Sequence, residues 1–285
     1  MAEKITLATL KKQKSQKQPI TMVTCYDFAS AVLAQQGGID SLLIGDSLAQ
    51  LMLGHSSTIN ATMEIMVALS AAVRRGAPDV YLIGDMPFLS YQVSIEKAIV
   101  NAGEFLTRGG CDCVKVEVDH RHLPTVSALA AAGIPVMAHL GLRPQSIGQI
   151  GKYAVQGKTA GAALELAELA KKMEAAGACS ILLECVLAQV AGAIAERTEL
   201  PVISCGSGLE CDGQVLVWHD LLDLPGAGTA KFTKKYAKIG SQIQQAIAEY
   251  ADEVRQKRFP QPEHCYNMKP EELRKFKDQL QKSDS

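Results

Sequence analysis

The stretch Ser41-Leu-Leu-Ile-Gly-Asp-Ser47 carries the pattern from which the fold can be inferred. Its first part is apolar and lacks the alternation of a strand with one solvent-facing side. It therefore predicts a parallel strand that is covered on both faces. The run then ends in two polar residues, Asp46 and Ser47. Where such a run is followed by a helical stretch, the pattern is that of a β-α unit.

The same unit recurs from residue 20 to about residue 225. We expect strands at residues 20–27, 41–47, 80–86, 113–119, 135–140, 180–185 and 201–205, with a weaker one around 215–222. We expect helices between them at residues 28–36, 63–75, 95–108, 123–132, 160–176 and 187–197. Several of these helices end at a glycine, which suits a left-handed C-cap.

About eight such units, with no Pro- or Ser-rich linker, predict an α/β fold, the closed (β/α)8 or TIM barrel. An open doubly wound sheet is the alternative. That fold usually has a Gly-rich turn after its first strand, and Cys25-Tyr-Asp-Phe28 contains no glycine. We expect residues 1–285 to form a single barrel domain with a C-terminal helical extension at about 227–285.

Composition excludes several classes of protein. The 285 residues include 29 Lys and Arg and 30 Asp and Glu, and this near-neutral balance argues against a nucleic-acid partner. A hydrophobic fraction of 47% excludes a disordered chain. No window approaches the ~20 apolar residues of a membrane span, and residues 1–18 lack the apolar stretch of a secretion signal. The eight cysteines include no C-x-x-C pair, so we expect free thiols and a cytoplasmic protein.

The polar residues at the strand ends are the candidate site residues, because these ends meet at one mouth of a barrel. They are Asp46, Asp85, Lys115, Glu117, His139 and Glu184. Lys115 and Glu117 are two residues apart on one strand and so share a face. His139 could be catalytic, a substrate contact or a structural residue. Gly206-Ser-Gly208 could bind phosphate, although a tight turn is the favoured interpretation.

Four carboxylates at one mouth would repel one another unless a cation or shared protons relieved them. Oxygen ligands without a Cys or His cluster favour a hard divalent ion, with Mg²⁺ ahead of zinc. Asp46 and Asp85 suit the ligand role, with Glu117 as a third ligand, directly or through water. Glu184 lies four strands from Asp46 and is placed to act as a general base.

These residues predict a class of reaction. A metal chelated by a 2-oxo acid would polarise the carbonyl group and ease removal of the neighbouring C–H proton. Lys115 could balance the carboxylate or enolate charge. The enolate is a carbon nucleophile, so the predicted chemistry is formation or cleavage of a carbon–carbon bond.

Longer motifs run in order along residues 20–265. They are Thr24-Cys-Tyr-Asp27, Leu43-Ile-Gly-Asp-Ser-Leu48, Gly54-His-Ser-Ser-Thr58, Ala72-Val-Arg-Arg-Gly-Ala77, Gly84-Asp-Met-Pro-Phe88, Val114-Lys-Val-Glu117, Ala138-His-Leu-Gly-Leu-Arg-Pro-Gln-Ser146, Tyr153-Ala-Val-Gln-Gly157, Leu183-Glu-Cys185 and Asp212-Gly-Gln-Val-Leu-Val217. Together they resemble the ketopantoate hydroxymethyltransferase (3-methyl-2-oxobutanoate hydroxymethyltransferase) family.

The resemblance implies a barrel of the phosphoenolpyruvate/pyruvate superfamily that forms a homo-oligomer, typically a decamer. It implies transfer of a one-carbon unit from 5,10-methylenetetrahydrofolate to 3-methyl-2-oxobutanoate, giving 2-dehydropantoate for pantothenate and coenzyme A synthesis. By motif, the Mg²⁺ ligands are Asp46, Asp85 and Glu117, and the proton acceptor is Glu184. The oxo-acid contacts are Asp46, Ser47, Asp85 and Lys115. No motif marks the folate-binding residues.

Three loops depart from the family pattern, at Val118-Asp-His120, Ser56-Ser-Thr-Ile-Asn-Ala61 and Ser204-Cys-Gly-Ser-Gly208. They bear on substrate binding more than on reaction class. A lyase or decarboxylase of a 2-oxo or 2-hydroxy dicarboxylate is the alternative enzyme, but the Lys-Lys-Cys-Gly-type motif of such lyases is absent. A barrel kept only as an assembly scaffold would have no use for buried like charges.

Overall fold

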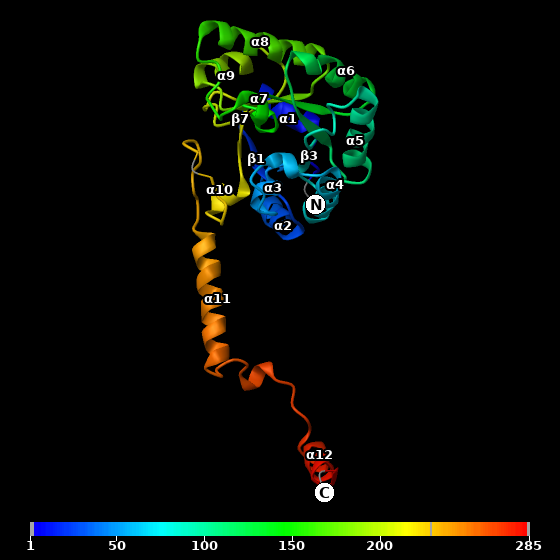
Figure 1. Cartoon of the computed structure of the whole chain (residues 1–285), viewed down its shortest axis with the longest axis vertical. Coiled ribbons are helices and arrows are strands. Elements are labelled where there is room, and N and C mark those ends of the chain that lie inside the picture. Colours follow the sequence, from blue (N-terminus) through cyan, green and yellow to red (C-terminus); the bar gives the residue numbers. More distant parts are fainter. Residues whose placement is uncertain (1–2, 229, 284–285) are drawn as a thin grey trace. The chain divides into compact units, whose positions relative to one another are not determined.

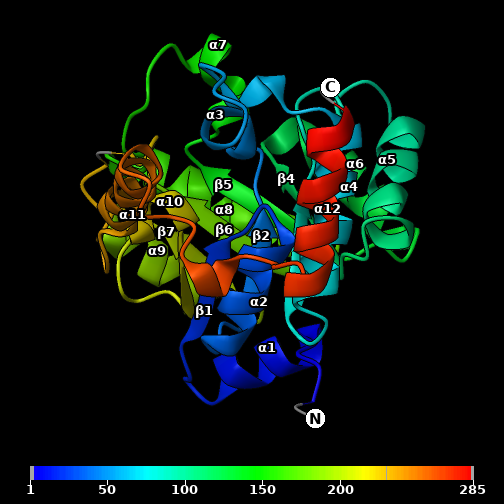
Figure 2. The same ribbon diagram turned by 90° about the horizontal axis from the view of Figure 1, so that it is seen from below.

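Parallel strands close into a barrel in which each strand pairs with the next and β8 pairs with β1. The computed structural model describes residues 3–228 and 230–283. The strands are β1 (Ile20–Thr24), β2 (Ser41–Ile44), β3 (Tyr81–Asp85), β4 (Cys113–Glu117), β5 (Val136–Gly141), β6 (Ser180–Glu184), β7 (Val202–Cys205) and β8 (Gly213–Leu216). Figures 1 and 2 show helices around these strands. The predicted (β/α)8 barrel is confirmed.

The predicted connecting helices also form, with ends that differ by at most two residues. They are α2 (Phe28–Gln36), α4 (Met63–Gly76), α5 (Ile95–Thr107), α6 (Leu123–Ala131), α8 (Ala160–Ala175) and α9 (Ala188–Ala195). Further elements lie before, between or after them: α1 (Leu7–Ser15), α3 (Leu48–Leu51), α7 (Ile147–Ile150), α10 (Trp218–Leu222) and the 3-10 turns Thr58–Asn60, His120–His122 and Pro144–Ser146. Side chains at the helix starts accept backbone N–H bonds, as Asp27 does from Ser30 at 2.9 Å.

The prediction of an eighth strand around residues 215–222 was wrong at its end. β8 stops at Leu216, and helix α10 begins at Trp218. The Thr24 hydroxyl at the end of β1 accepts a hydrogen bond from the Trp218 backbone N–H at 3.0 Å. The first turn of α10 is therefore tied to β1, so the chain cannot continue as a strand at this point.

Alternation along the strands separates an inner from an outer core. On β4, Val114 and Val116 face the cluster that includes helix residues such as Phe105, whereas Cys113 lies in an inner cluster with Tyr81. Leu10 of α1 belongs to this inner cluster and is 2% exposed. The same inward face of β4 continues through Lys115 to Glu117. An apolar floor therefore lies below the polar residues at the carboxyl end of the barrel.

Gly84 on β3 gives a prediction about stability. A methyl group on this glycine would overlap the ring of Phe105 on α5, which is fully buried. We expect Gly84→Ala to destabilise the chain by about 1–3 kcal/mol through overpacking. Urea unfolding would measure this loss.

Gly103→Ala is the matched control. Gly103 lies on α5, and nothing stands within 4 Å of the position its methyl group would take. A Gly-to-Ala change inside a helix should stabilise by about 0.5–1 kcal/mol. Equal free energies of unfolding for the two variants would contradict the proposed close contact between β3 and α5.

The chain divides into two compact units, Met1–Ala237 and Lys238–Ser285. The first holds the barrel. The second contains α11 (Ile239–Arg255), a 3-10 turn (Pro262–His264) and α12 (Pro270–Ser283). The expectation of one domain with an extension at about 227–285 stays a prediction. No helix among the described residues is both long and apolar enough to cross a membrane. All eight cysteines are free thiols.

Candidate active site

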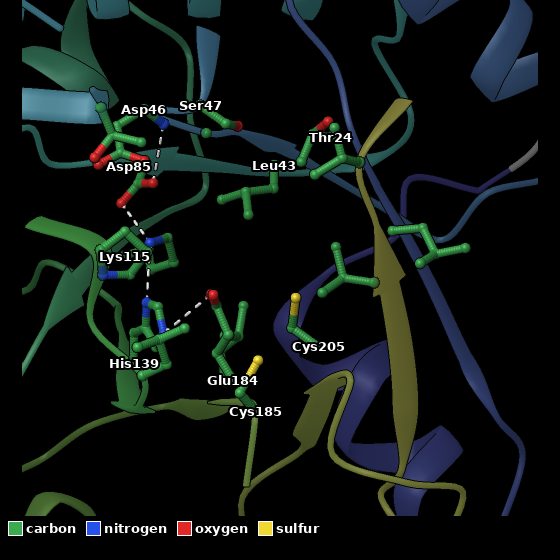
Figure 3. A pocket seen from close by; sticks show the side chains of 18 of the residues that line it. Thr24, Leu43, Asp46, Ser47, Asp85, Lys115, His139, Glu184, Cys185 and Cys205 are labelled. Carbon is green, nitrogen blue, oxygen red and sulfur yellow. Dashed lines mark hydrogen bonds and ion pairs between the residues drawn. The ribbon is translucent and has the colours of Figure 1, made fainter. Parts of the chain in front are cut away.

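A cavity of about 360 Å³ opens at the carboxyl end of the barrel. Every predicted site residue lines it: Asp46, Ser47, Asp85, Lys115, Glu117, His139 and Glu184. Figure 3 shows the charged side chains of Asp46, Asp85 and Lys115 on one side of this cavity, with Leu43 and Cys205 across from them. The structure thus brings together residues that are up to 138 positions apart in the sequence, from Asp46 to Glu184.

The strands place these side chains in register. Asp85, the last residue of β3, is the partner of Lys115 on β4. Glu117, at the end of β4, is the partner of His139 on β5. Glu184 ends β6. Because all strands run the same way, their polar carboxyl ends share one rim.

Lys115 is the cation at the centre of the site. Its Nζ lies 2.7 Å from Asp85 Oδ1, and the two side chains are 5% and 2% exposed. Burial by itself would lower the pKa of Lys115, but the charges of Asp85, Asp46 and Glu117 outweigh burial and raise it above its ordinary value. The ammonium group is therefore charged over the physiological pH range.

The carboxylates outnumber this one cation. Burial raises the pKa of Asp85 to about 7, although the neighbouring Lys115 opposes the shift. Burial also raises the pKa of Glu117 well above its ordinary value. Both shifts show that the ionised forms are costly here and that further positive charge would stabilise them.

His139 links the cation to the remaining carboxylate. Burial and the Lys115 ammonium hold the pKa of His139 well below its ordinary value, so the ring is neutral. Lys115 Nζ lies 3.2 Å from His139 Nδ1, and an ammonium group can only donate, so Nδ1 is the acceptor. The ring proton then sits on Nε2, which is 3.5 Å from Glu184 Oε2. Burial raises the pKa of Glu184 to about 7, again opposed by Lys115.

A divalent cation suits this set of donors. Asp85 Oδ1 forms an ion pair with Lys115 but has no hydrogen bond. The ligand atoms that the carboxylates offer are oxygens, which hard divalent cations prefer. Among the described residues, no three or more His, Cys, Asp and Glu side chains are already gathered as a metal cluster. The predicted set Asp46, Asp85 and Glu117 is therefore not gathered as three ligands, and it is the unbonded Asp85 oxygen that fits Mg²⁺, an ion that binds through one or two carboxylates and keeps several waters.

Two features of the site were missed or left open by sequence reasoning. Thr58 lines the cavity, and its buried hydroxyl has no hydrogen-bond partner. No role was assigned to Thr58 from sequence, although it lies in the family motif Gly54–Thr58 and in the loop Ser56–Ala61, which departs from the family pattern. Gln145 was also given no role, yet it contacts Asp46 and Glu117. The available signals were its place in the motif Ala138–Ser146 and its polar side chain in the loop after β5.

The loop after β7 is a tight turn. Gly206 and Gly208 have φ values of 69° and 98°. The Ser207 hydroxyl donates to the Leu183 carbonyl at 2.8 Å and accepts from the Val186 N–H at 3.0 Å. Its hydrogen bonds are thus made within the chain, in agreement with the favoured interpretation.

In a second departing loop, Asp119 pairs with Arg143 and Arg121, each at 2.6 Å. Hydrogen bonds from these two arginines overcome burial and hold the pKa of Asp119 well below its usual range. Asp119 therefore organises the loop after β4.

Solved structures with a similar fold include phosphonopyruvate hydrolase in complex with oxalate and Mg²⁺, with a TM-score of 0.60 and 12% identity over 97% of this chain and 96% of that one. A second is 2,3-dimethylmalate lyase, described as a PEP mutase/isocitrate lyase superfamily member. It has a TM-score of 0.58 and 17% identity over 98% of this chain and 97% of that one. At these identities the likeness concerns the fold alone, and it agrees with the closed (β/α)8 barrel.

Relatives of much higher identity share one name, 3-methyl-2-oxobutanoate hydroxymethyltransferase. The Geobacillus thermodenitrificans protein is 47% identical over 94% of this chain and 96% of its own length. The Carboxydothermus hydrogenoformans protein is 44% identical over 96% of this chain and 99% of its own length. Residues 4–262 match the family described as ketopantoate hydroxymethyltransferase. The chain therefore belongs to the ketopantoate hydroxymethyltransferase family.

Proposed function

We propose that this chain is a 3-methyl-2-oxobutanoate hydroxymethyltransferase. It transfers a one-carbon unit from 5,10-methylenetetrahydrofolate to 3-methyl-2-oxobutanoate and so forms 2-dehydropantoate. Water supplies the hydroxyl oxygen, and tetrahydrofolate leaves. The observation that carries the proposal is the convergence of Asp46, Asp85, Lys115, His139 and Glu184 in one cavity of a chain from this family.

Asp46 and Asp85 would hold Mg²⁺, with Glu117 as a further ligand, directly or through water. When bound, the ion supplies a Lewis acid that polarises the carbonyl group of the oxo acid. Lys115 balances the negative charge of the substrate and of the enolate. Ser47 and His139 bind the oxo acid, and the Nε2–H of His139 is available for this purpose.

Glu184 is the proposed general base. It removes the proton from C3 of 3-methyl-2-oxobutanoate, and the resulting carbon nucleophile attacks the one-carbon unit of the folate. The shifted pKa of Glu184 suits a base that must accept a proton near neutral pH and release it in each cycle.

This assignment predicts how the reaction depends on pH. With a pKa of about 7, Glu184 loses its proton as pH rises through neutrality. The rate of C3 proton exchange should therefore rise about tenfold between pH 6 and pH 8 and then level off. Exchange into deuterated buffer, followed by NMR at saturating Mg²⁺, would measure the profile. A flat profile over this range would contradict a base of this pKa.

A single assay tests the proposed reaction. The chain is incubated with 3-methyl-2-oxobutanoate and 5,10-methylenetetrahydrofolate, with Mg²⁺ or with EDTA, and 2-dehydropantoate is measured. Product that requires both folate and Mg²⁺ supports the proposal. Cleavage of a 2-hydroxy dicarboxylate without folate would favour the lyase alternative. The decameric assembly and the cytoplasmic location remain proposals from the family, and analytical ultracentrifugation would test the first.

A further inference from the structure

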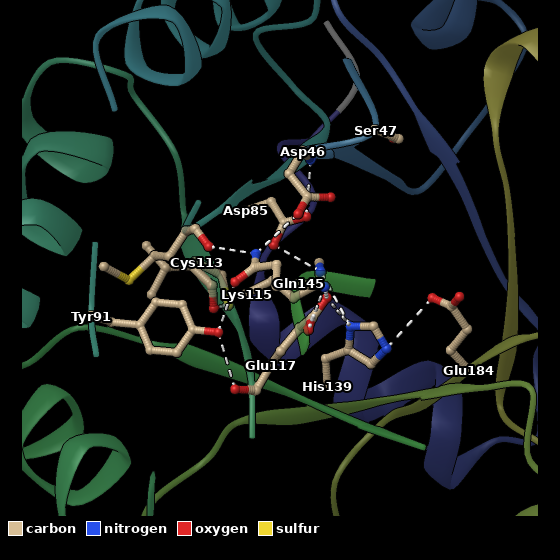
Figure 4. Close-up of polar contacts among 12 residues, drawn as sticks. Asp46, Ser47, Asp85, Tyr91, Cys113, Lys115, Glu117, His139, Gln145 and Glu184 are labelled. Carbon is tan, nitrogen blue, oxygen red and sulfur yellow. Dashed lines mark hydrogen bonds and ion pairs between the residues drawn. The ribbon is translucent and has the colours of Figure 1, made fainter. Parts of the chain in front are cut away.

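Gln145 lies just outside the cavity and touches the side chains that face it. It belongs to the 3-10 turn Pro144–Ser146, which follows β5, and it is 4% exposed. Figure 4 shows its amide among Asp46, Tyr91 and Glu117. It is not among the residues that line the cavity, and it reaches the site through Asp46 and Glu117.

Gln145 holds two carboxylates, Asp46 in the loop just after β2 and Glu117 at the end of β4. Its Nε2 donates to Asp46 Oδ2 at 3.0 Å and to the Met86 carbonyl at 3.0 Å. Its backbone N–H donates to Glu117 Oε2 at 3.1 Å and to Oε1 at 3.3 Å. Hydrogen bonds to ionised acceptors are stronger than neutral ones, so these contacts restrict the rotamers of both carboxylates.

Two acceptors set the direction of the Gln145 amide, and the Tyr91 hydroxyl lies at its other end. Tyr91 is a buried residue, with 2% of its surface exposed. Its hydroxyl lies 3.0 Å from Gln145 Oε1 and 3.1 Å from the Glu117 carbonyl. The Asp46 carboxylate and the Met86 carbonyl can only accept, so the end of the amide that faces them is the N–H end, whereas the Tyr91 hydroxyl at the other end can donate or accept. A flipped amide would lose its contacts with Asp46 and Met86, although it could still donate to the Tyr91 hydroxyl. The amide is therefore fixed with its N–H groups toward Asp46.

We propose that Gln145 is a positioning residue that prepares Asp46 and Glu117 to bind the divalent cation. This inference rests on the proposed metal site. Outer partners of metal ligands orient those ligands, and their loss typically lowers metal affinity by about 10- to 100-fold. Gln145 performs this task for two ligands at once, with its side chain for one and its backbone for the other.

The test is a Mn²⁺ titration of the full chain, with free Mn²⁺ measured by electron paramagnetic resonance. Gln145→Met keeps the length of the side chain and removes its N–H donors, so the Mn²⁺ dissociation constant should rise about 10- to 100-fold. Gln149→Met is the matched control, because Gln149 is exposed on α7 near the same loop. Its affinity should equal that of the unmodified chain. Tyr91→Phe should weaken binding in the same direction but less, and it serves as a second variant if Gln145→Met does not fold.

Turnover at saturating metal separates positioning from a merely structural effect. If Gln145 acts through the metal ligands, excess metal restores kcat in Gln145→Met. Unchanged Mn²⁺ affinity in both Gln145→Met and Tyr91→Phe would overturn the role of Gln145 alone. A low kcat that persists at saturating metal would also overturn the role of Gln145. Failure of the unmodified chain to bind Mn²⁺ would overturn the metal site and this role together, and the two failures are thereby distinguished.

Discussion

Glu184→Gln is expected to slow exchange of the C3 proton of 3-methyl-2-oxobutanoate by about 10²- to 10⁴-fold. The amide has nearly the same shape as the carboxyl group but cannot accept the proton. Glu184 Oε2 lies 3.5 Å from His139 Nε2, and the amide oxygen can face the same ring nitrogen. The cavity should therefore keep its shape while the base is lost. NMR in deuterated water with saturating Mg²⁺ would measure the exchange.

Binding must survive for this result to identify the base. Mg²⁺ and the oxo acid should bind Glu184→Gln as tightly as they bind the unmodified chain, because Glu184 is not among the proposed ligands. Glu168→Gln, an exposed change on α8, is the matched control and should exchange at the normal rate. Undiminished exchange in Glu184→Gln would remove Glu184 as the proton acceptor.

Lys115→Met should show the largest loss of stability, about 3–5 kcal/mol in EDTA. Lys115 is the ion-pair partner of Asp85, and both side chains are almost fully buried. Without the ammonium group, Asp85 and Glu117 would have no counter-ion in the folded state, so they would either stay ionised at a cost or take up protons, because burial already raises the pKa of both. Mg²⁺ that binds only the folded chain should restore part of the loss by mass action. Urea unfolding in EDTA and in Mg²⁺ would measure both effects.

Two comparisons isolate the buried pair. Arg108→Met removes an exposed pair with Glu104 on α5, for which a cost of about 0.3–0.5 kcal/mol is expected. Adding Asp85→Asn to Lys115→Met removes the unpaired charge and should recover part of the stability. If Lys115→Met costs no more than Arg108→Met, the pair does not balance the charge of the site.

The barrel and the meeting of the candidate site residues at its mouth could be predicted from sequence, because both follow from short-range patterns. Apolar runs such as Ser41–Ile44 mark a parallel strand without any knowledge of its partners. The residue that ends each run must lie at the barrel mouth, which is why Asp85 and Glu184 could be assigned in advance. The same argument placed Lys115 and Glu117 on one face of β4.

The features that were not predicted depend on contacts between distant parts of the chain. Gln145 meets Asp46 across 99 positions, and nothing in its immediate neighbours indicates that contact. Likewise, β8 ends at Leu216, earlier than predicted, because the Thr24 hydroxyl accepts a hydrogen bond from the first turn of α10, 194 positions away. Hydrogen bonds of this kind are set by tertiary geometry, which local propensity does not contain.

The inward face of β4 has a consequence for how such an enzyme can change. Cys113, Lys115 and Glu117 face inward only because a strand alternates its side chains, so a one-residue insertion or deletion would exchange the two faces. Lys115 and Glu117 would then point among the apolar helices, and Val114 and Val116 would enter the cavity. Amino acids along β4 can be replaced one by one with graded effects, whereas an insertion or deletion within β4 ahead of Lys115 would disrupt folding and chemistry together. The register of β4 must therefore be kept as a whole, whereas the loops on either side of the strand can vary in length.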